Sequence, residues 1–77
     1  MAAIVYFKKT SEDERTIRYS FGPEPDQMAR VLTFDKTTHR STPQDDRTDH
    51  EFRAASRKIT TTFQERGTWP EKGMHVS

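Results

Sequence analysis

The feature of the sequence that most constrains the fold is one amphipathic pattern between residues 48 and 66. Small and apolar side chains recur there at intervals of three and four, the spacing that places them on one side of an α-helix. The positions with this spacing are Phe52, Ala55, Ser56, Ile59, Phe63 and Arg66. A helix with one narrow apolar stripe is stable only when the stripe packs against another layer. The rest of the chain therefore has to supply that layer.

Both ends of the predicted helix carry capping residues. The run from Thr48 to Glu51 fits a capping box, in which the Thr48 hydroxyl accepts a hydrogen bond from the amide of Glu51 and the Glu51 carboxylate accepts one from the amide of Thr48. Gly67 is placed for a left-handed C-cap, and Pro70 stops any continuation. A helix over 48–66 is about 28 Å long, which is enough to cross a small sheet.

Two segments at the start of the chain have strand character. Residues 3–9 are rich in side chains that favour strands. Over residues 15–22, apolar and polar side chains alternate, as in a strand with one buried face. The apolar positions of that alternation are Ile17, Tyr19 and Phe21. The short, charged connection between the two segments predicts a β-hairpin.

Alternation resumes over residues 29–35, where Leu32 and Phe34 share one face, and this predicts a third strand. The polar stretch over 39–42 is compatible with a short fourth strand and equally with a loop. The residues after the helix, 67–77, are predicted to form an irregular tail.

These elements predict one small α+β domain over residues 1–77. A three- to four-stranded antiparallel sheet, built as a meander of hairpins, is followed by one C-terminal amphipathic helix that packs on one face. The core must be small, because only 30% of the residues are hydrophobic and 32% are charged. The chain has no cysteine, so no disulfide reinforces this core. Partner binding or dimerisation is therefore a reasonable expectation.

The first predicted strand is unusual because both of its faces are apolar. One face carries Val5 and Phe7, and the other carries Ile4 and Tyr6. A strand with one face in water needs only one apolar face, so something has to cover the second. We favour the tail, because the large side chain of Trp69 is rarely left free in a small domain. The alternative cover is a second copy of the protein.

This shortage of cover indicates where the function lies. We expect a small non-enzymatic protein-binding or regulatory module, and self-association is one form of that function. The partner is an unidentified protein or, in a homodimer, a second copy of the chain. The residues expected to contact it are Ile4, Tyr6, Trp69 and Met74.

The sequence holds no catalytic signature, and we predict no enzymatic activity, catalytic residue or cofactor. A chain with no cysteine, no Gly-x-Ser-x-Gly elbow and only three glycines cannot form the common nucleophile or phosphate-binding motifs. Residues 45–51 are rich in potential ligands but lack the pattern of a calcium loop or a zinc protease. The three histidines at 39, 50 and 75 are widely spaced, so no metal site is predicted.

Nucleic-acid binding is the alternative function. Arg53, Arg57 and Lys58 lie off the apolar stripe and give the predicted helix a basic flank. An open sheet face could add arginines and a tyrosine for base stacking. The candidates for that face are Arg18, Arg30, Arg40, Tyr6 and Tyr19. The net charge of +1 gives this alternative no support at the level of the whole chain.

The expected location is the cytoplasm. The apolar run at the start of the chain is too short for a signal peptide or a membrane span, so no membrane partner is predicted. A composition without cysteine also fits a reducing compartment.

Four short runs of the sequence resemble one group of proteins. They are Tyr19-Ser20-Phe21-Gly22, Leu32-Thr33-Phe34-Asp35, Ala55-Ser56-Arg57-Lys58-Ile59 and Gly67-Thr68-Trp69-Pro70. Together they make the chain similar to small uncharacterised proteins of about this length from actinobacteria, the high-GC Gram-positive bacteria. The resemblance implies a cytoplasmic bacterial domain. It implies no catalytic residue, because the shared runs are strand, helix and cap.

Overall fold

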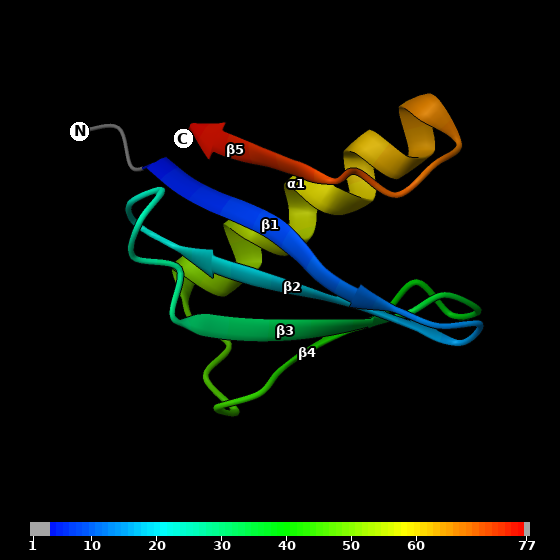
Figure 1. Cartoon of the computed structure of the whole chain (residues 1–77), viewed down its shortest axis with the longest axis horizontal. Helices are drawn as coiled ribbons and strands as arrows, with labels where there is room; N and C mark the ends of the chain where they lie inside the picture. The colour runs from blue at the N-terminus through cyan, green and yellow to red at the C-terminus, as the bar shows by residue number, and fades with distance from the viewer. Residues whose placement is uncertain (1–3, 77) are drawn as a thin grey trace.

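A computed structural model describes residues 4–76 of the chain (Figure 1). Its elements are β1 (Ile4–Glu12), β2 (Thr16–Gly22), β3 (Arg30–Asp35), β4 (Ser41–Pro43), α1 (His50–Arg66) and β5 (Lys72–Val76). The predicted α+β class is confirmed, with an antiparallel sheet of five strands rather than three or four.

The strands lie in the order β4-β3-β2-β1-β5. The first four form a meander, and α1 then carries the chain back so that β5 pairs with the other side of β1. The helix packs over β1, β2 and β5 on one side of the sheet, as Figure 1 shows. We call this side of the sheet the inner face and the opposite side the outer face. No helix of the described chain covers the outer face.

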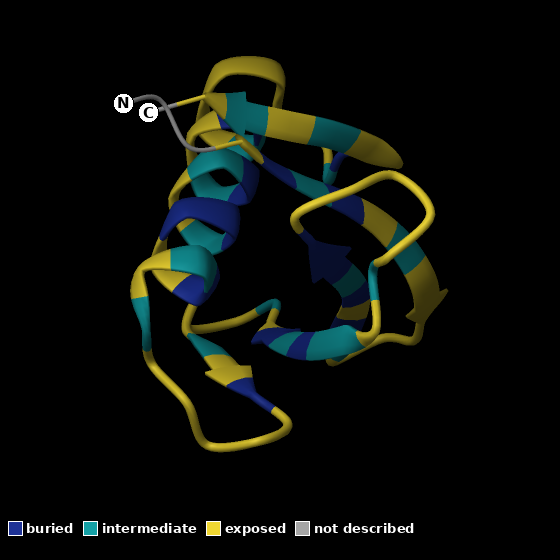
Figure 2. Cartoon of the chain, turned by 90° about the vertical axis from the view of Figure 1, so that its left-hand side faces the viewer, coloured by how far each residue is buried: buried dark blue, intermediate teal, exposed yellow. Residues whose placement is uncertain are grey.

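The core lies between the inner face and α1. The alternating residues of β2, Ile17, Tyr19 and Phe21, are all completely buried, as their pattern predicts. Figure 2 shows that the buried part of α1 faces the sheet. The other core residues are Val5, Phe7, Leu32, Phe34, Phe52, Ala54, Ala55 and Ile59. β1, β2 and β3 therefore each contribute alternate side chains to one layer.

The N-terminus of the helix differs from the prediction. The helix starts at His50, and its N-cap is Asp49, whose side chain accepts a hydrogen bond from the amide of Phe52 at 3.1 Å. The predicted Thr48 capping box is therefore wrong. Thr48 and Asp49 are both good capping residues, and a pattern of residue types does not choose between neighbours. The C-cap prediction is confirmed: Gly67 is left-handed at φ 75° and donates to the carbonyl of Phe63.

The tail also differs from the prediction. Residues 67–77 were expected to be irregular, but Lys72–Val76 form β5 beside β1. The tail thus extends the sheet and does not fold over the outer face. Gly73 permits this pairing, because a Cβ atom there would come within 2.7 Å of the Phe7 ring.

The polar stretch after β3 contains a short strand. β4 spans Ser41–Pro43 and pairs with β3, so the strand alternative for 39–42 holds with a shift of boundary. His39 lies in the preceding turn with a positive φ of 62°. The Asp35 carboxylate stabilises this turn by accepting hydrogen bonds from the amides of Thr37 and Thr38.

A single buried hydroxyl joins the sheet to the segment after the helix. Tyr19 donates a hydrogen bond of 2.7 Å to the carbonyl of Pro70. Burial, and then the charges of Glu12 and Glu71, raise the pKa of Tyr19 well above its usual range. The folded protein therefore keeps this hydroxyl protonated and able to donate.

Tyr19→Phe is expected to lower the free energy of unfolding by about 1 kcal/mol, because the Pro70 carbonyl loses its donor. The raised pKa also makes the wild type lose stability as the pH rises above about 10, where the unfolded tyrosine ionises. Urea unfolding at increasing pH measures both effects. An equally steep alkaline loss in the phenylalanine variant would assign that loss to other groups.

Candidate protein-binding surface

The outer face is divided into rows of side chains that run across the strands. Val76 pairs with Ile4, and Met74 pairs with Tyr6 in the next row. One step further along, Lys72 pairs with Lys8. Along β1 and β5, the outer face therefore changes from two apolar rows to one basic row.

We call the first two rows the edge patch; it consists of Ile4, Tyr6, Met74 and Val76. Ile4 is 40% exposed, Met74 47% and Val76 54%, and no other large aliphatic or aromatic side chain of residues 4–76 is as open to solvent. Tyr6 is half-buried. The patch reaches one edge of the sheet, because β5 is the outermost strand on that side.

A groove of about 580 Å³ adjoins the edge patch. Its lining includes Tyr6 and Met74 from the sheet and Pro25 and Met28 from the connection between β2 and β3. This connection is folded closely over the end of β2. A Cβ atom on Gly22 would lie 1.9 Å from the backbone oxygen of Gln27. The outer face of β1 is therefore covered in part by the connection between β2 and β3, and not by the tail.

Lys8 and Lys72 line the same groove and face each other across β1 and β5. Like charges directly opposite on neighbouring strands repel each other. Both lysines are exposed, and among the described residues neither has an ion-pair partner. The groove therefore combines an apolar lining with two uncompensated positive charges.

Of the four residues predicted to contact a partner, the structure brings Ile4, Tyr6 and Met74 together and places Trp69 elsewhere. The Trp69 ring stacks on Phe63 with the centroids 4.3 Å apart, and it also contacts Phe34 at 5.3 Å. It is half-buried against the core, on the side of the molecule where the helix ends. Its role in the structure is to anchor the segment between α1 and β5.

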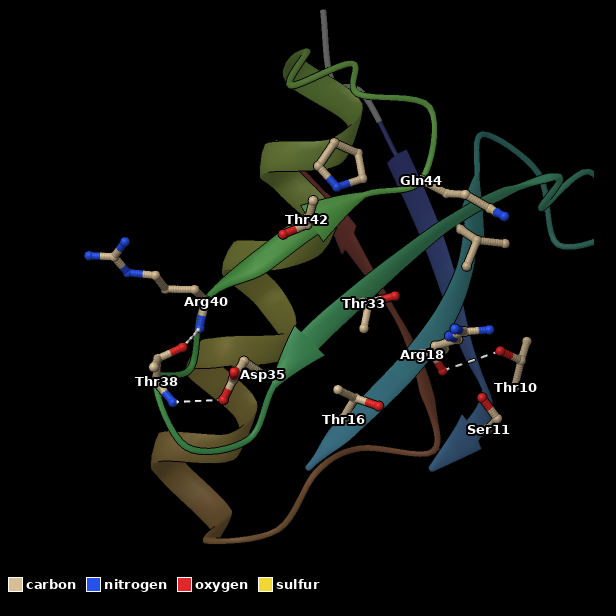
Figure 3. Close-up of a pocket in the computed structure, with 12 residues that line it drawn as sticks. Thr10, Ser11, Thr16, Arg18, Thr33, Asp35, Thr38, Arg40, Thr42 and Gln44 are labelled. Atoms are coloured by element: carbon tan, nitrogen blue, oxygen red, sulfur yellow. Dashed lines mark hydrogen bonds between the residues drawn. The ribbon is translucent and has the colours of Figure 1, made fainter. Parts of the chain in front are cut away.

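A second hollow lies at the other end of the outer face and is polar. It has a volume of about 860 Å³, and Figure 3 shows hydroxyl side chains and Arg18 along it. Cross-strand pairing sets one row of these side chains: Ser11, Arg18, Thr33 and Thr42. None of the described residues that line the hollow is aromatic, so they offer no platform for base stacking.

The residues proposed for nucleic-acid binding are only partly accessible. Arg53 and Arg57 are exposed one turn apart on α1, and Lys58 is half-buried beside them. Arg18 and Arg40 lie at the polar hollow. Two of the other candidates are excluded. Tyr19 is buried, and Arg30 is held by acidic residues.

Arg30 lies on the inner side of β3 and ties three segments together. Its Nε donates to Asp45 at 2.9 Å, and its Nη1 donates to Asp49 at 2.9 Å and to Glu51 at 3.2 Å. The guanidinium carbon lies 4.7 Å from the centre of the Phe21 ring. The guanidinium holds the pKa values of the Asp45 and Asp49 carboxyls below their usual range. The acidic run before the helix therefore binds an arginine of the chain itself.

The structure adds two observations on metals and membranes. Among residues 4–76, no three histidine, aspartate or glutamate side chains are grouped so that they could hold a metal ion. The helix in this part of the chain is not long and apolar enough to cross a membrane.

Comparison with protein-family models, with curated proteins and with solved structures found no match to this chain.

Proposed function

We propose that this protein is a non-enzymatic protein-binding or regulatory module that contacts its partner through the edge patch. The observation that carries the proposal is the distribution of apolar surface. The three exposed large hydrophobic side chains of residues 4–76, Ile4, Met74 and Val76, all belong to this one patch. A contiguous apolar patch next to polar surface is typical of a protein contact site.

The form of the edge patch supports this function over catalysis. The groove beside it is open to solvent, and none of the described residues that line it is a carboxylate or a histidine that could act as an acid or base. The proposal includes a cytoplasmic location, which a composition without cysteine fits. The partner is another protein or a second copy of the chain.

The double substitution Ile4→Ser with Met74→Ser tests the patch. Both side chains point away from the core, so the free energy of unfolding should change by less than about 1 kcal/mol. Proteins captured from the native cell extract by the wild type should be lost with this variant. Thr61→Ser with Gln64→Ser, on the exposed side of α1, is the matched control and should capture the same proteins as the wild type.

Sedimentation over a range of protein concentrations tests self-association. A dimer that the serine variant abolishes and the control variant retains would identify the second copy as the partner. A monomer at all concentrations, together with capture that the patch substitutions leave unchanged, would contradict the proposed function in both forms.

Nucleic-acid binding through α1 is a second candidate. The observation in its favour is that Arg53, Arg57 and Lys58 have no ion-pair partner in the part of the chain that the structure describes. If it is correct, a DNA or RNA mobility shift should weaken with salt. Replacing the three residues with alanine should weaken it uniformly across sequences. Absence of a shift at low salt would end this candidate.

A further inference from the structure

We propose that the edge patch binds an extended peptide segment in which aliphatic residues are followed by acidic ones, added as a strand beside β5. This inference rests on the proposed function and names the chemistry of the partner. It is carried by three features of the same surface: the open edge of β5, the apolar rows, and the lysine row beside them.

The first feature is the open edge. β5 is the outermost strand, and no described strand pairs with its far side. The opposite edge of the sheet is protected, because β4 has only three residues and ends at Pro43, which has no amide hydrogen to donate. β5 has five residues and no proline, so its backbone can hydrogen-bond to a further strand.

The second feature is the order of side chains along β5. Val76, Met74 and Lys72 all point to the outer face, two residues apart. A strand added beside β5 presents alternate side chains opposite these three. Antiparallel pairs are the more stable type, so the first of the three faces Val76, the next faces Met74 and the last faces Lys72. The preferred segment is therefore aliphatic-x-aliphatic-x-acidic.

The third feature is the charge around the groove. Lys9, the neighbour of Lys8 in β1, pairs with Glu12 and Glu71. Lys8 and Lys72, which face each other, have no ion-pair partner within residues 4–76. Glu71, next to Lys72 in the chain, pairs with Lys9, and the exposed Glu24 and Asp26 of the connection after β2 form no ion pair with either lysine. An acidic side chain of a partner would relieve the repulsion between Lys8 and Lys72.

Charge and surface chemistry select this occupant over two others. A second copy added through its own β5 would present Lys72, Met74 and Val76, a strand with no acidic side chain to pair with Lys8 or Lys72. A nucleic acid would match the lysines, but three of the four patch side chains are aliphatic and the one ring, that of Tyr6, is half-buried. Aliphatic side chains next to lysines fit a protein segment of mixed aliphatic and acidic character.

The test uses two fluorescently labelled peptides and the intact protein. The first peptide, Gly-Ser-Val-Thr-Ile-Thr-Glu-Thr-Glu-Gly-Ser, carries the predicted pattern, and in the second both glutamates are lysines. Fluorescence anisotropy should show that the first binds at least about tenfold more tightly. Binding of the first peptide should also shift the backbone amide signals of residues 72–76 in NMR spectra. A peptide with the order reversed should bind more weakly than the first.

A charge exchange makes the test specific. The double variant Lys8→Glu with Lys72→Glu keeps a like-charged pair on the two strands, so its stability should stay close to that of the wild type. It should bind the glutamate peptide at least about tenfold more weakly and should prefer the lysine peptide. The matched control, Arg53→Glu with Arg57→Glu on α1, should bind both peptides as the wild type does.

The results separate this inference from the proposed function. Equal binding of the two peptides, or no binding of either, overturns the inference. So does a dimer that depends on the edge patch, or an RNA oligonucleotide that shifts the β5 amides in place of the peptide. If the two peptides bind equally or neither binds, loss of captured protein in the Ile4 and Met74 double variant would still support the proposed function.

Discussion

Replacing Arg30 with leucine is expected to lower the free energy of unfolding by about 3 kcal/mol. The side chain of Arg30 is only 16% exposed, and it forms ion pairs with Asp45, Asp49 and Glu51. Its removal leaves Asp45 and Glu51 without an ion-pair partner in residues 4–76, while Asp49 keeps only the exposed Arg47. It also removes the donor that connects β3 to the carbonyl of Arg47. Urea unfolding at about pH 7 measures the change.

The effect should decrease in acid. Hydrogen bonds from Arg30 lower the pKa values of Asp45 and Asp49 in the folded protein. A carboxyl with a lowered pKa stabilises the fold above its unfolded pKa of about 3.9, and this stabilisation is lost as the pH falls through the folded pKa. The wild type and the Arg30→Leu variant should therefore differ less at about pH 3 than at about pH 7.

Arg40→Leu provides the control, because Arg40 is exposed and its side chain makes no ion pair within residues 4–76. It should change the free energy of unfolding by less than about 0.5 kcal/mol. If both leucine variants were equally stable, the ion pairs of Arg30 with Asp45, Asp49 and Glu51 would contribute nothing measurable to the stability of the fold.

Replacing Gly22 with alanine should also be strongly destabilising, by about 3 kcal/mol. The new Cβ atom would lie 1.9 Å from the backbone oxygen of Gln27 and 2.9 Å from the Cα atom of Met28. Backbone atoms cannot rotate away as a flexible side chain can, so the whole connection between β2 and β3 must move. Because Pro25 and Met28 move with it, the groove should widen. Thermal unfolding and NMR shifts of residues 23–29 report the two effects.

Gly67→Ala is the matched control for this steric argument. Nothing lies within 4 Å of a Cβ atom at Gly67, but its φ of 75° is unfavourable for alanine. Its expected loss is about 1 kcal/mol and should leave the groove unchanged. A Gly22→Ala variant no less stable than Gly67→Ala would show that the connection after β2 is loosely held.

The local elements were predictable because they depend on neighbours in sequence. The alternation of Ile17, Tyr19 and Phe21 specified the inner face of β2, and Gly67 specified the end of α1. The choice of Asp49 over Thr48 as N-cap was not predictable in this way. It coincides with the ion pair that Arg30, from a strand far back in the sequence, makes with Asp49.

The fifth strand was not predictable from its own residues. Lys72 and Gly73 disfavour strand formation, and the apolar Met74 and Val76 point outward. The strand forms because β1 has a free edge that a strand can join, which is a property of the assembled sheet. The edge patch, in contrast, was partly predictable, because both faces of β1 are apolar. That pattern located Ile4 and Tyr6, but it did not say that the tail would lie beside them.

The sequence contains a signal for the role of Arg30. Arg30, Leu32 and Phe34 are two residues apart, so the strand pattern itself places the arginine on the buried side. A cation at such a position needs carboxylates, and an acidic run follows at residues 45–51. The position of Trp69 had no comparable signal, because its contacts with Phe34 and His39 join segments that are far apart in sequence.

The pairing of Ile4 with Val76 has a practical consequence for any fusion protein. The two ends of the described chain lie side by side at the end of the edge patch that is farther from Lys8 and Lys72. Figure 1 shows these adjacent ends of β1 and β5. A tag, reporter or carrier domain joined at either end thus starts next to the proposed contact surface. A bulky attachment there would hinder access by a partner, so capture experiments require a long flexible spacer. The connection between β1 and β2, at the other end of the sheet, is the better position for a label.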